Sequence, residues 1–337
     1  MEHRPQREGR DANERGAVEQ DPFIASDTVE HDVPVPYLER TRRYYQALGY
    51  GEPYRWAHHA TVPFARLAAP LAHCTVGLVT TAAPYRAGAF ATDGELAYQA
   101  KGKFHAVYSA DTAHDPDLRI THVAIDFQHT HADDPNTWFP LPALRRAAAA
   151  GRIGAVAPRF HGMPTNRSQR RTLDVDVPEL LERCRADAVH AVLLVANCPV
   201  CHQTLALAAR ALEANGIATV VMGCAKDIVE RVGVARFLFS DFPLGNAAGR
   251  PHDTASQDAT LALALDLLEC APAPRTTVQS PLTWASDPSW KLDYANVDRL
   301  TPEDIARRRR AFDRAKREAK ANPTDGAHDD PRRGVGD

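Results

Sequence analysis

Cys198 and Cys201 are separated by two residues, and His202 follows directly. The preceding residues, 189–196, form a continuous apolar run typical of a strand that is buried on both faces, and residues 203–215 have the Ala- and Leu-rich pattern of a helix. Both thiols therefore lie near a helix N-terminus, where backbone N–H groups and the helix dipole favour thiolate over thiol. The pattern predicts a redox-active dithiol, with one cysteine as nucleophile and the other as resolving thiol.

Other chemistries fit parts of this C-x-x-C-H pattern. Haem c attachment has the same letters, but it needs export, and no apolar signal segment is evident upstream. A zinc site needs two further ligands, and among the remaining cysteines only Cys224 is a candidate for closing on the pair in space. Two buried cysteines acting as small apolar residues are the structural alternative. In the dithiol interpretation, His202 lowers a thiol pKa or carries a proton.

His129 and His131 follow a segment, 120–127, that we expect to contain a strand. Imidazoles at the carboxyl end of a strand can serve as acid or base, so we predict that one of the two is the acid of the site. A polar surface loop with two adjacent histidines is the alternative.

Residues 160–171 lack periodicity and are rich in hydrogen-bond donors. We predict a loop in which Asn166 and Arg167 hold a substrate carboxylate, with the Arg167 guanidinium as a bidentate clamp. Parallel strands place their carboxyl ends on one side of a sheet, where α/β proteins bind ligands. We therefore expect this loop, the two histidines and the cysteine pair to share one cleft.

The elements that must position these residues alternate between strand and helix from residue 178 onward. This alternation predicts an α/β protein with a parallel sheet in Rossmann-like or flavodoxin-like layers, built as two similar lobes. We expect a disordered N-terminal tail (1–32), a first α/β lobe (33–172), a second α/β lobe carrying the cysteine pair (173–300), and a C-terminal helix with a disordered tail (301–337). Expected strands are 74–81, 120–127, 189–196, 217–222 and 237–239, and expected helices are 35–49, 141–150, 178–187, 203–215, 226–232, 255–270 and 301–321.

The composition is that of an ordinary globular chain: 337 residues, 44% hydrophobic and 25% charged, with a formal net charge of −3. This charge gives no general attraction to nucleic acid. No apolar run approaches the roughly 18 residues that a membrane span needs. Six cysteines in a chain of this length do not form a disulfide framework, which favours a reducing cytoplasm. The basic run 307–310 is expected to be a solvated helix face, with an anionic partner as the alternative.

Several segments together resemble the glycine/sarcosine/betaine reductase selenoprotein B family, including the related D-proline reductase subunit. The resemblance spans roughly residues 35–270 and is carried by 35–50, 54–58, 129–131 with 139–141, 191–202, 220–223 with 227–229, and 237–246. In that family, a selenocysteine in this strand-end cluster forms a redox pair with cysteine. Here cysteine occupies both positions, Cys198 and Cys201.

The resemblance implies an oxidoreductase that reductively cleaves a small amino-acid-like substrate, with a disulfide as acceptor. It implies no cofactor bound in this chain and no metal. The implied partners are a pyruvoyl-bearing subunit, whose pyruvoyl group activates the substrate, or a thiol-reductant protein. Two alternatives remain: a non-catalytic, zinc-binding partner subunit, and a cysteine-based racemase in which Cys198 faces Cys224 across the substrate.

Overall fold

The computed structural model describes residues 33–50, 52–84, 104–120, 124–165 and 167–321. Both tails that we expected to be disordered, 1–32 and 322–337, lie outside the described residues, and so does Asn166. From Pro34 onward the described residues belong to one unit.

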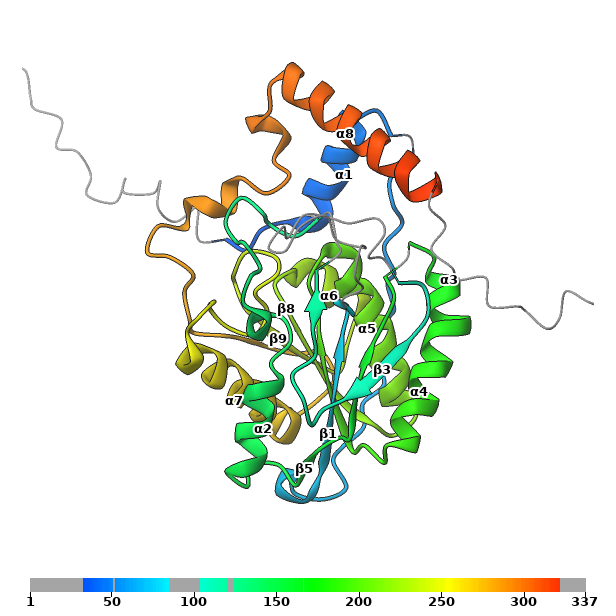
Figure 1. Ribbon diagram of the computed structural model, residues 1–337, viewed down its shortest axis with the longest axis vertical. Coiled ribbons are helices and arrows are strands. Elements are labelled where there is room, and N and C mark those ends of the chain that lie inside the picture. The colour runs from blue at the N-terminus through cyan, green and yellow to red at the C-terminus, as the bar shows by residue number, and fades with distance from the viewer. Residues whose placement is uncertain (1–32, 51, 85–103, 121–123, 166, 322–337) are drawn as a thin grey trace, which may run out of the picture. The chain divides into compact units, whose positions relative to one another are not determined.

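A mostly parallel sheet forms the centre of this unit (Figure 1). Its strands in the described part of the chain are β1 (Thr75–Thr80), β3 (Tyr108–Asp111), β5 (Ala155–Val156), β6 (Arg159–Gly162), β7 (Ala191–Val195), β8 (Ala218–Gly223), β9 (Arg236–Phe239) and β10 (Thr276–Gln279). Their order is β10-β9-β8-β7-β1-β6-β3, with β5 also paired to β1; β3 runs antiparallel to β6 and the other pairs are parallel. Two short strands, β2 (Ala83–Pro84) and β4 (Leu118–Arg119), pair separately.

Helices cover both faces of the sheet, which confirms the predicted α/β layers. α2 (Leu141–Ala149) and α7 (Thr254–Cys270) pack together on one face, and α4 (Val177–Ala186), α5 (Pro199–Ala214) and α6 (Lys226–Val232) pack on the other (Figure 1). The remaining helical elements are α1 (Tyr37–Ala47), α3 (Gln169–Arg171), α8 (Pro302–Ala321), a π-helical turn (Thr172–Asp176) and 3-10 turns at Leu71–His73, Pro135–Thr137, Pro288–Leu292 and Val297–Arg299.

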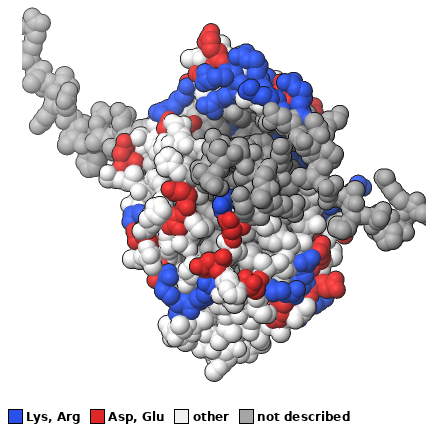
Figure 2. Space-filling model, in the orientation of Figure 1, with Lys and Arg blue, Asp and Glu red and all other residues white. Residues whose placement is uncertain are grey.

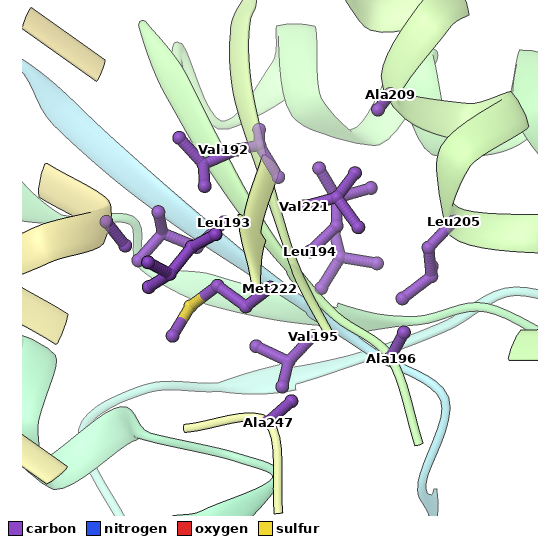
Figure 3. Close-up of a cluster of buried hydrophobic side chains, with 14 of the residues drawn as sticks. Val192, Leu193, Leu194, Val195, Ala196, Leu205, Ala209, Val221, Met222 and Ala247 are labelled. Atoms are coloured by element: carbon purple, nitrogen blue, oxygen red, sulfur yellow. The ribbon is translucent and has the colours of Figure 1, made fainter. Parts of the chain in front are cut away.

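The core lies where α5 packs on the middle strands. Every residue of β7 and β8 is buried, as expected for parallel strands covered on both faces. Leu205 and Ala209 of α5 lie toward Leu194 and Val221 on one face, while Ala247 lies near Val195 on the other (Figure 3). Burying each of the larger side chains contributes about 1.5–3 kcal/mol. This packing fixes the first turn of α5 against the end of β7.

The strand order reverses at β1. β6 lies on one side of β1, and β7 to β10 follow one another on the other side. In open α/β sheets, ligands bind at the carboxyl ends of the strands where the order reverses. β7 ends at Val195, three residues before Cys198, so the cysteine pair lies at this point.

The structure differs from the expected lobes. β1 from the first stretch pairs with β7 from the second over five residue pairs, so both stretches contribute to one continuous sheet. Two segments also differ. In 120–127, the described residues 124–127 form turns instead of a strand. The segment 160–171 was expected to be a loop, but its first residues belong to β6. The polar His161 is accommodated within this strand because it is buried and hydrogen-bonded to Ser109 on β3.

Candidate active site at the cysteine pair

Cys198 is the N-cap residue of α5. Its backbone is extended (φ −120°, ψ 168°), Pro199 occupies the first helical position, and the Cys198 Sγ accepts a hydrogen bond from the Cys201 N–H at 3.2 Å. Proline suits this position because the first helical N–H has no partner within the helix. The sulfur thus sits where capping oxygens usually lie, at the positive end of the helix dipole.

Cys198 and Cys201 are joined at disulfide distance, with 4.9 Å between their Cα atoms. The Cys198 side chain is almost buried, at 4% exposed, and Cys201 is fully buried. The other cysteines are free thiols, buried at Cys74, Cys184 and Cys224 and exposed at Cys270. The predicted pair is therefore the one that the fold brings together.

The imidazole of His202 is fully engaged by the backbone. Its Nδ1 lies 2.7 Å from the Cys198 carbonyl oxygen, and its Nε2 accepts hydrogen bonds from the N–H groups of Cys224 (2.9 Å) and Ala225 (3.1 Å). A carbonyl only accepts, so Nδ1 carries the hydrogen and the ring is neutral. Burial lowers the pKa of His202 to about 4, although the bond to Cys198 opposes this.

From the sequence we expected His202 to lower a thiol pKa or to carry a proton, but its contacts indicate a structural role. Neither ring nitrogen is available to exchange a proton with a sulfur, and a neutral ring cannot stabilise a thiolate by charge. Instead, His202 ties the loop after β7 to the loop after β8. Gly223 makes room for the ring, since a Cβ there would lie 2.5 Å from His202 Cδ2.

Cys224 lies on the other side of His202, at the end of β8. Burial raises the pKa of its thiol to about 12, and the negative charges of Asp241 and Asp126 act in the same direction. Backbone hydrogen bonds from Asn246 and Phe242 oppose this rise.

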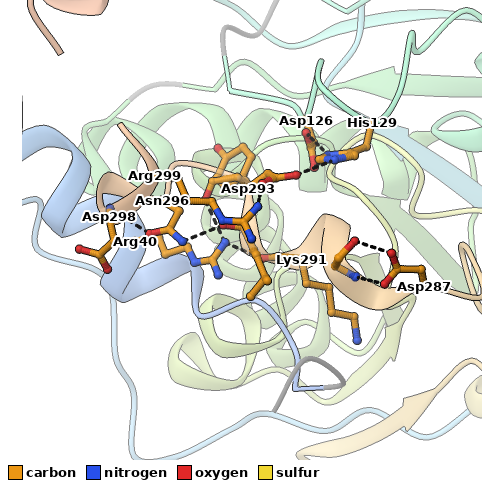
Figure 4. A network of polar contacts seen from close by, with 12 residues as sticks. Arg40, Asp126, His129, Asp287, Lys291, Asp293, Asn296, Asp298 and Arg299 are labelled. Atoms are coloured by element: carbon orange, nitrogen blue, oxygen red, sulfur yellow. Dashed lines mark hydrogen bonds and ion pairs between the residues drawn. The ribbon is translucent and has the colours of Figure 1, made fainter. Parts of the chain in front are cut away.

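His129 lies between two carboxylates (Figure 4). Its Nδ1 is 3.1 Å from both Asp126 oxygens, and its Nε2 is 3.1 Å from Asp293 Oδ2. The loop carrying Asp126 is fixed next to the sheet by a hydrogen bond from the Asp126 N–H to the Leu244 carbonyl. Burial raises the pKa of the Asp126 carboxyl, while His129 opposes the shift. His131, in contrast, is exposed.

A C-terminal segment, 287–299, covers His129. Lys291 forms a largely buried ion pair with Asp241, and the Tyr294 hydroxyl donates to the Ala124 carbonyl at 3.0 Å. Arg40 of α1 donates to the Lys291 carbonyl at 2.6 Å, which anchors the segment on the other side (Figure 4). His129 is therefore partly covered, with 18% of its side chain exposed.

Arg167 lies on the α5 side of the cysteine pair. Its guanidinium packs over the Tyr45 ring at 5.1 Å and donates to the Tyr45 hydroxyl at 3.1 Å, and its backbone carbonyl accepts from the Tyr54 hydroxyl at 3.2 Å. Tyr54 in turn accepts a hydrogen bond from Gln203 of α5. Hydrogen bonds through Tyr54 thus connect Arg167 to Gln203 of α5, whereas His129 contacts Asp126 and Asp293.

Sequence reasoning missed several residues at this edge. Gln203 is buried next to His202. A polar side chain within an Ala- and Leu-rich helix could have indicated this residue from the sequence. Asn197 donates to Thr81 Oγ1 at 3.2 Å across the strand reversal. In the described part of the chain, Asn197 Oδ1 and the Tyr37 hydroxyl are buried without a hydrogen-bond partner.

Within the residues that the structure describes, no three His, Cys, Asp or Glu side chains are grouped as a metal site requires. None of the described helices has the length and apolar character to span a membrane.

The fold and the site define an α/β protein with a cysteine pair at a helix N-terminus, next to the point where strand order reverses. The chain is 28% identical over 171 residues to the D-proline reductase subunit gamma of Acetoanaerobium sticklandii, an alignment that covers 50% of this chain and 70% of that protein. No protein-family model and no solved structure matches the chain. The similarity supports a relation to the reductase group, and the glycine/betaine selenoprotein B assignment stays a prediction.

Proposed function

We propose that this protein is a thiol/disulfide-dependent oxidoreductase of the D-proline reductase type, which reductively cleaves a small amino-acid-like substrate. The observation that carries the proposal is the Cys198–Cys201 pair at disulfide distance on the N-terminus of α5. The similarity to a D-proline reductase subunit supports a reductase-related function.

The dithiol supplies what such a cleavage consumes. One C–N bond breaks, and one C–H and one N–H bond form, which requires two electrons and two protons. The two thiols provide both and end as the disulfide. An external thiol reductant or a partner protein then returns the pair to the dithiol state by thiol–disulfide exchange.

Cys198 is the nucleophile in this proposal, and Cys201 is the resolving thiol. The Cys198 sulfur accepts the Cys201 N–H and is the less buried of the two side chains. Charge-assisted hydrogen bonds from backbone N–H groups stabilise an anion, so they favour a thiolate at Cys198. The Cys201 side chain lies in the core and reacts only with its neighbour.

The remaining site residues have separate parts. Arg167 binds the substrate carboxylate together with Asn166, and His129 or His131 supplies a proton. His202 positions the loops and stays neutral. We further propose a cytoplasmic location and a partner subunit, with a pyruvoyl group of that partner as the electrophile that activates the substrate.

Single-cysteine variants test the proposal. In a C270A background, which removes the exposed thiol, Cys201→Ser leaves Cys198 without its resolving partner. Incubated with glutathione disulfide, this variant should accumulate a stable mixed disulfide at Cys198, detected by intact mass and peptide mapping. The matched Cys198→Ser variant should accumulate far less, because Cys201 is fully buried. Equal labelling of both variants, or labelling of neither, would refute the assignment.

A further inference from the structure

A buried glutamine links the cysteine-bearing helix to a neighbouring strand-like segment. Gln203 follows the cysteine motif on α5, is 1% exposed, and its Oε1 accepts the Ala57 N–H at 2.7 Å. A backbone N–H can only donate, so this bond fixes the orientation of the amide. The Nε2 group must then be the donor to the Tyr54 hydroxyl, as the geometry shows.

The link continues from Tyr54 to Arg167. Because Tyr54 accepts from Gln203, its own hydrogen is free to donate, and the Arg167 carbonyl accepts it at 3.2 Å. A second bond, from Gln169 Nε2 to the Arg55 carbonyl at 2.6 Å, holds the same two segments together. The Arg167 side chain is fixed separately on Tyr45, so this arginine is held at both its backbone and its guanidinium.

We propose that Gln203 and Tyr54 are positioning residues that set the Arg167 guanidinium relative to the Cys198–Cys201 pair, so that a carboxylate-bearing substrate meets the thiolate. The inference rests on the proposed function. It assigns to Gln203 and Tyr54 the alignment of the substrate with the Cys198 sulfur. Gln203 suits this task because the first two turns of one helix carry both the sulfur and the amide. Any displacement of Tyr54 changes the distance between anion clamp and nucleophile.

Charge-selective alkylation tests the proposal without knowledge of the natural substrate. Iodoacetate carries a carboxylate and iodoacetamide does not, so the ratio of their rates with reduced Cys198 measures the local positive charge. The measurement uses the full chain with Cys201→Ser and C270A, which removes the partner thiol and the exposed thiol. Peptide mapping separates alkylation at Cys198 from alkylation at the buried Cys74, Cys184 and Cys224. A variant that only loosens the fold changes the iodoacetate and iodoacetamide rates by the same factor. A variant that displaces Arg167 changes the ratio of the two rates.

Arg167→Gln should lower the ratio about two- to fourfold, as expected for removing one nearby charge in a partly solvated site. Tyr54→Phe should lower it comparably, although it removes no charge and changes no residue of α5, because it removes the hydroxyl that joins Gln203 to the Arg167 carbonyl. Gln203→Met should do the same. The control is Tyr50→Phe, which removes a tyrosine hydroxyl bonded to Asp313 on α8 and should leave the ratio unchanged.

The outcomes separate the two levels of the proposal. If Arg167→Gln lowers the ratio but Tyr54→Phe and Gln203→Met do not, the positioning role is wrong and the anion clamp stands. An unchanged ratio in Arg167→Gln removes the clamp and the positioning role together, while the dithiol chemistry stands. Failure of Cys198 to react with either reagent contradicts the proposed function itself.

Discussion

A sulfur at a helix N-cap faces two competing demands. The Cys201 N–H and the dipole of α5 favour a thiolate at Cys198, whereas near-complete burial disfavours any charge. The pair resolves this conflict in the oxidised state, because a disulfide carries no charge and still accepts the N–H. Upon reduction, the more exposed sulfur is the one that can hold the charge, which is why the roles of the two cysteines differ.

Cys198 should therefore react as a thiolate near neutral pH. In the Cys201→Ser, C270A protein, the iodoacetamide rate should reach half its maximum below pH 8, compared with about 8.5 for an ordinary thiol. The same protein unfolded in urea provides the reference, since unfolding removes the helix. A folded-state profile with its midpoint at or above that of the unfolded protein would show that burial outweighs the helix terminus.

His202 should matter for stability more than for thiol chemistry. Replacing His202 by Ala opens a cavity and leaves the Cys224 and Ala225 N–H groups unpaired, so we expect a loss of about 2–5 kcal/mol in unfolding free energy. Urea denaturation measures this loss. His190→Ala is the control, because His190 accepts one N–H at an exposed site and should cost less than about 1 kcal/mol. Equal losses in both variants would contradict the role assigned to His202.

At the scale of elements, the ends of β7 and β8 are held together by one ring. His202 bridges the two loops, and the close approach of β8 requires a residue without a side chain at position 223. The position of the cysteine pair thus depends on β8, although β8 contributes no reactive side chain.

Gly223→Ala tests this dependence. The added methyl would lie 2.5 Å from His202 Cδ2, so the ring or the strand must shift, at a cost of about 1–3 kcal/mol. Gly77→Ala on β1 is a matched control, because its methyl would meet Val189 Cγ1 at 3.2 Å and needs a smaller adjustment. Thermal unfolding of both variants gives the comparison, and a smaller loss for Gly223→Ala than for Gly77→Ala would argue against the tight contact.

Elements were predictable where the local pattern is strong. β7 and β8 are continuous apolar runs, and α5, α6 and α7 are runs of helix-forming residues with clear boundaries, so their positions were predicted from sequence within a few residues. β6 was missed because its buried His161 is polar, and β10 because its residues are only half-buried. The expected strand at 120–127 is wrong in its described part, because the chain turns there and the Asp126 N–H donates to the Leu244 carbonyl instead of to a neighbouring strand.

At the scale of the whole molecule, pairings between distant segments escaped prediction. Nothing local indicates that β1 lies beside β7, yet this pairing makes one sheet from two expected lobes. The same holds for the site. The cysteine pair is local and was found from sequence, whereas the contacts of Gln203 with Tyr54 and of His129 with Asp293 join segments that are far apart in the chain.

Buried histidines should make the molecule sensitive to acid. Burial lowers the pKa of His202 and of His161 to about 4. Between pH 6.5 and 4 the unfolded chain binds protons that the folded chain excludes, so stability is lost as pH falls. Burial raises the pKa of Asp227 to about 6, which acts in the opposite direction because the folded state then binds the proton.

For His202, His161 and Asp227 alone, the change should be a loss on the order of 3 kcal/mol between pH 6.5 and 4. Burial also raises the pKa of Asp126 and Glu213, which reduces this loss. Urea denaturation across this range measures it. Asp227→Asn removes the opposing contribution and should steepen the loss. Stability that stays constant or rises on acidification would contradict this assignment of charges.

The central claim is that Cys198 and Cys201 act as a reversible two-electron couple. The most direct measurement equilibrates the full chain in mixtures of reduced and oxidised dithiothreitol, quenches with acid, and maps each cysteine by alkylation and mass spectrometry. We predict that Cys198 and Cys201 change state together along one two-electron curve, while the buried Cys74, Cys184 and Cys224 remain thiols throughout. A pair that stays reduced under oxidant, or a disulfide that forms with another cysteine instead, would contradict the account.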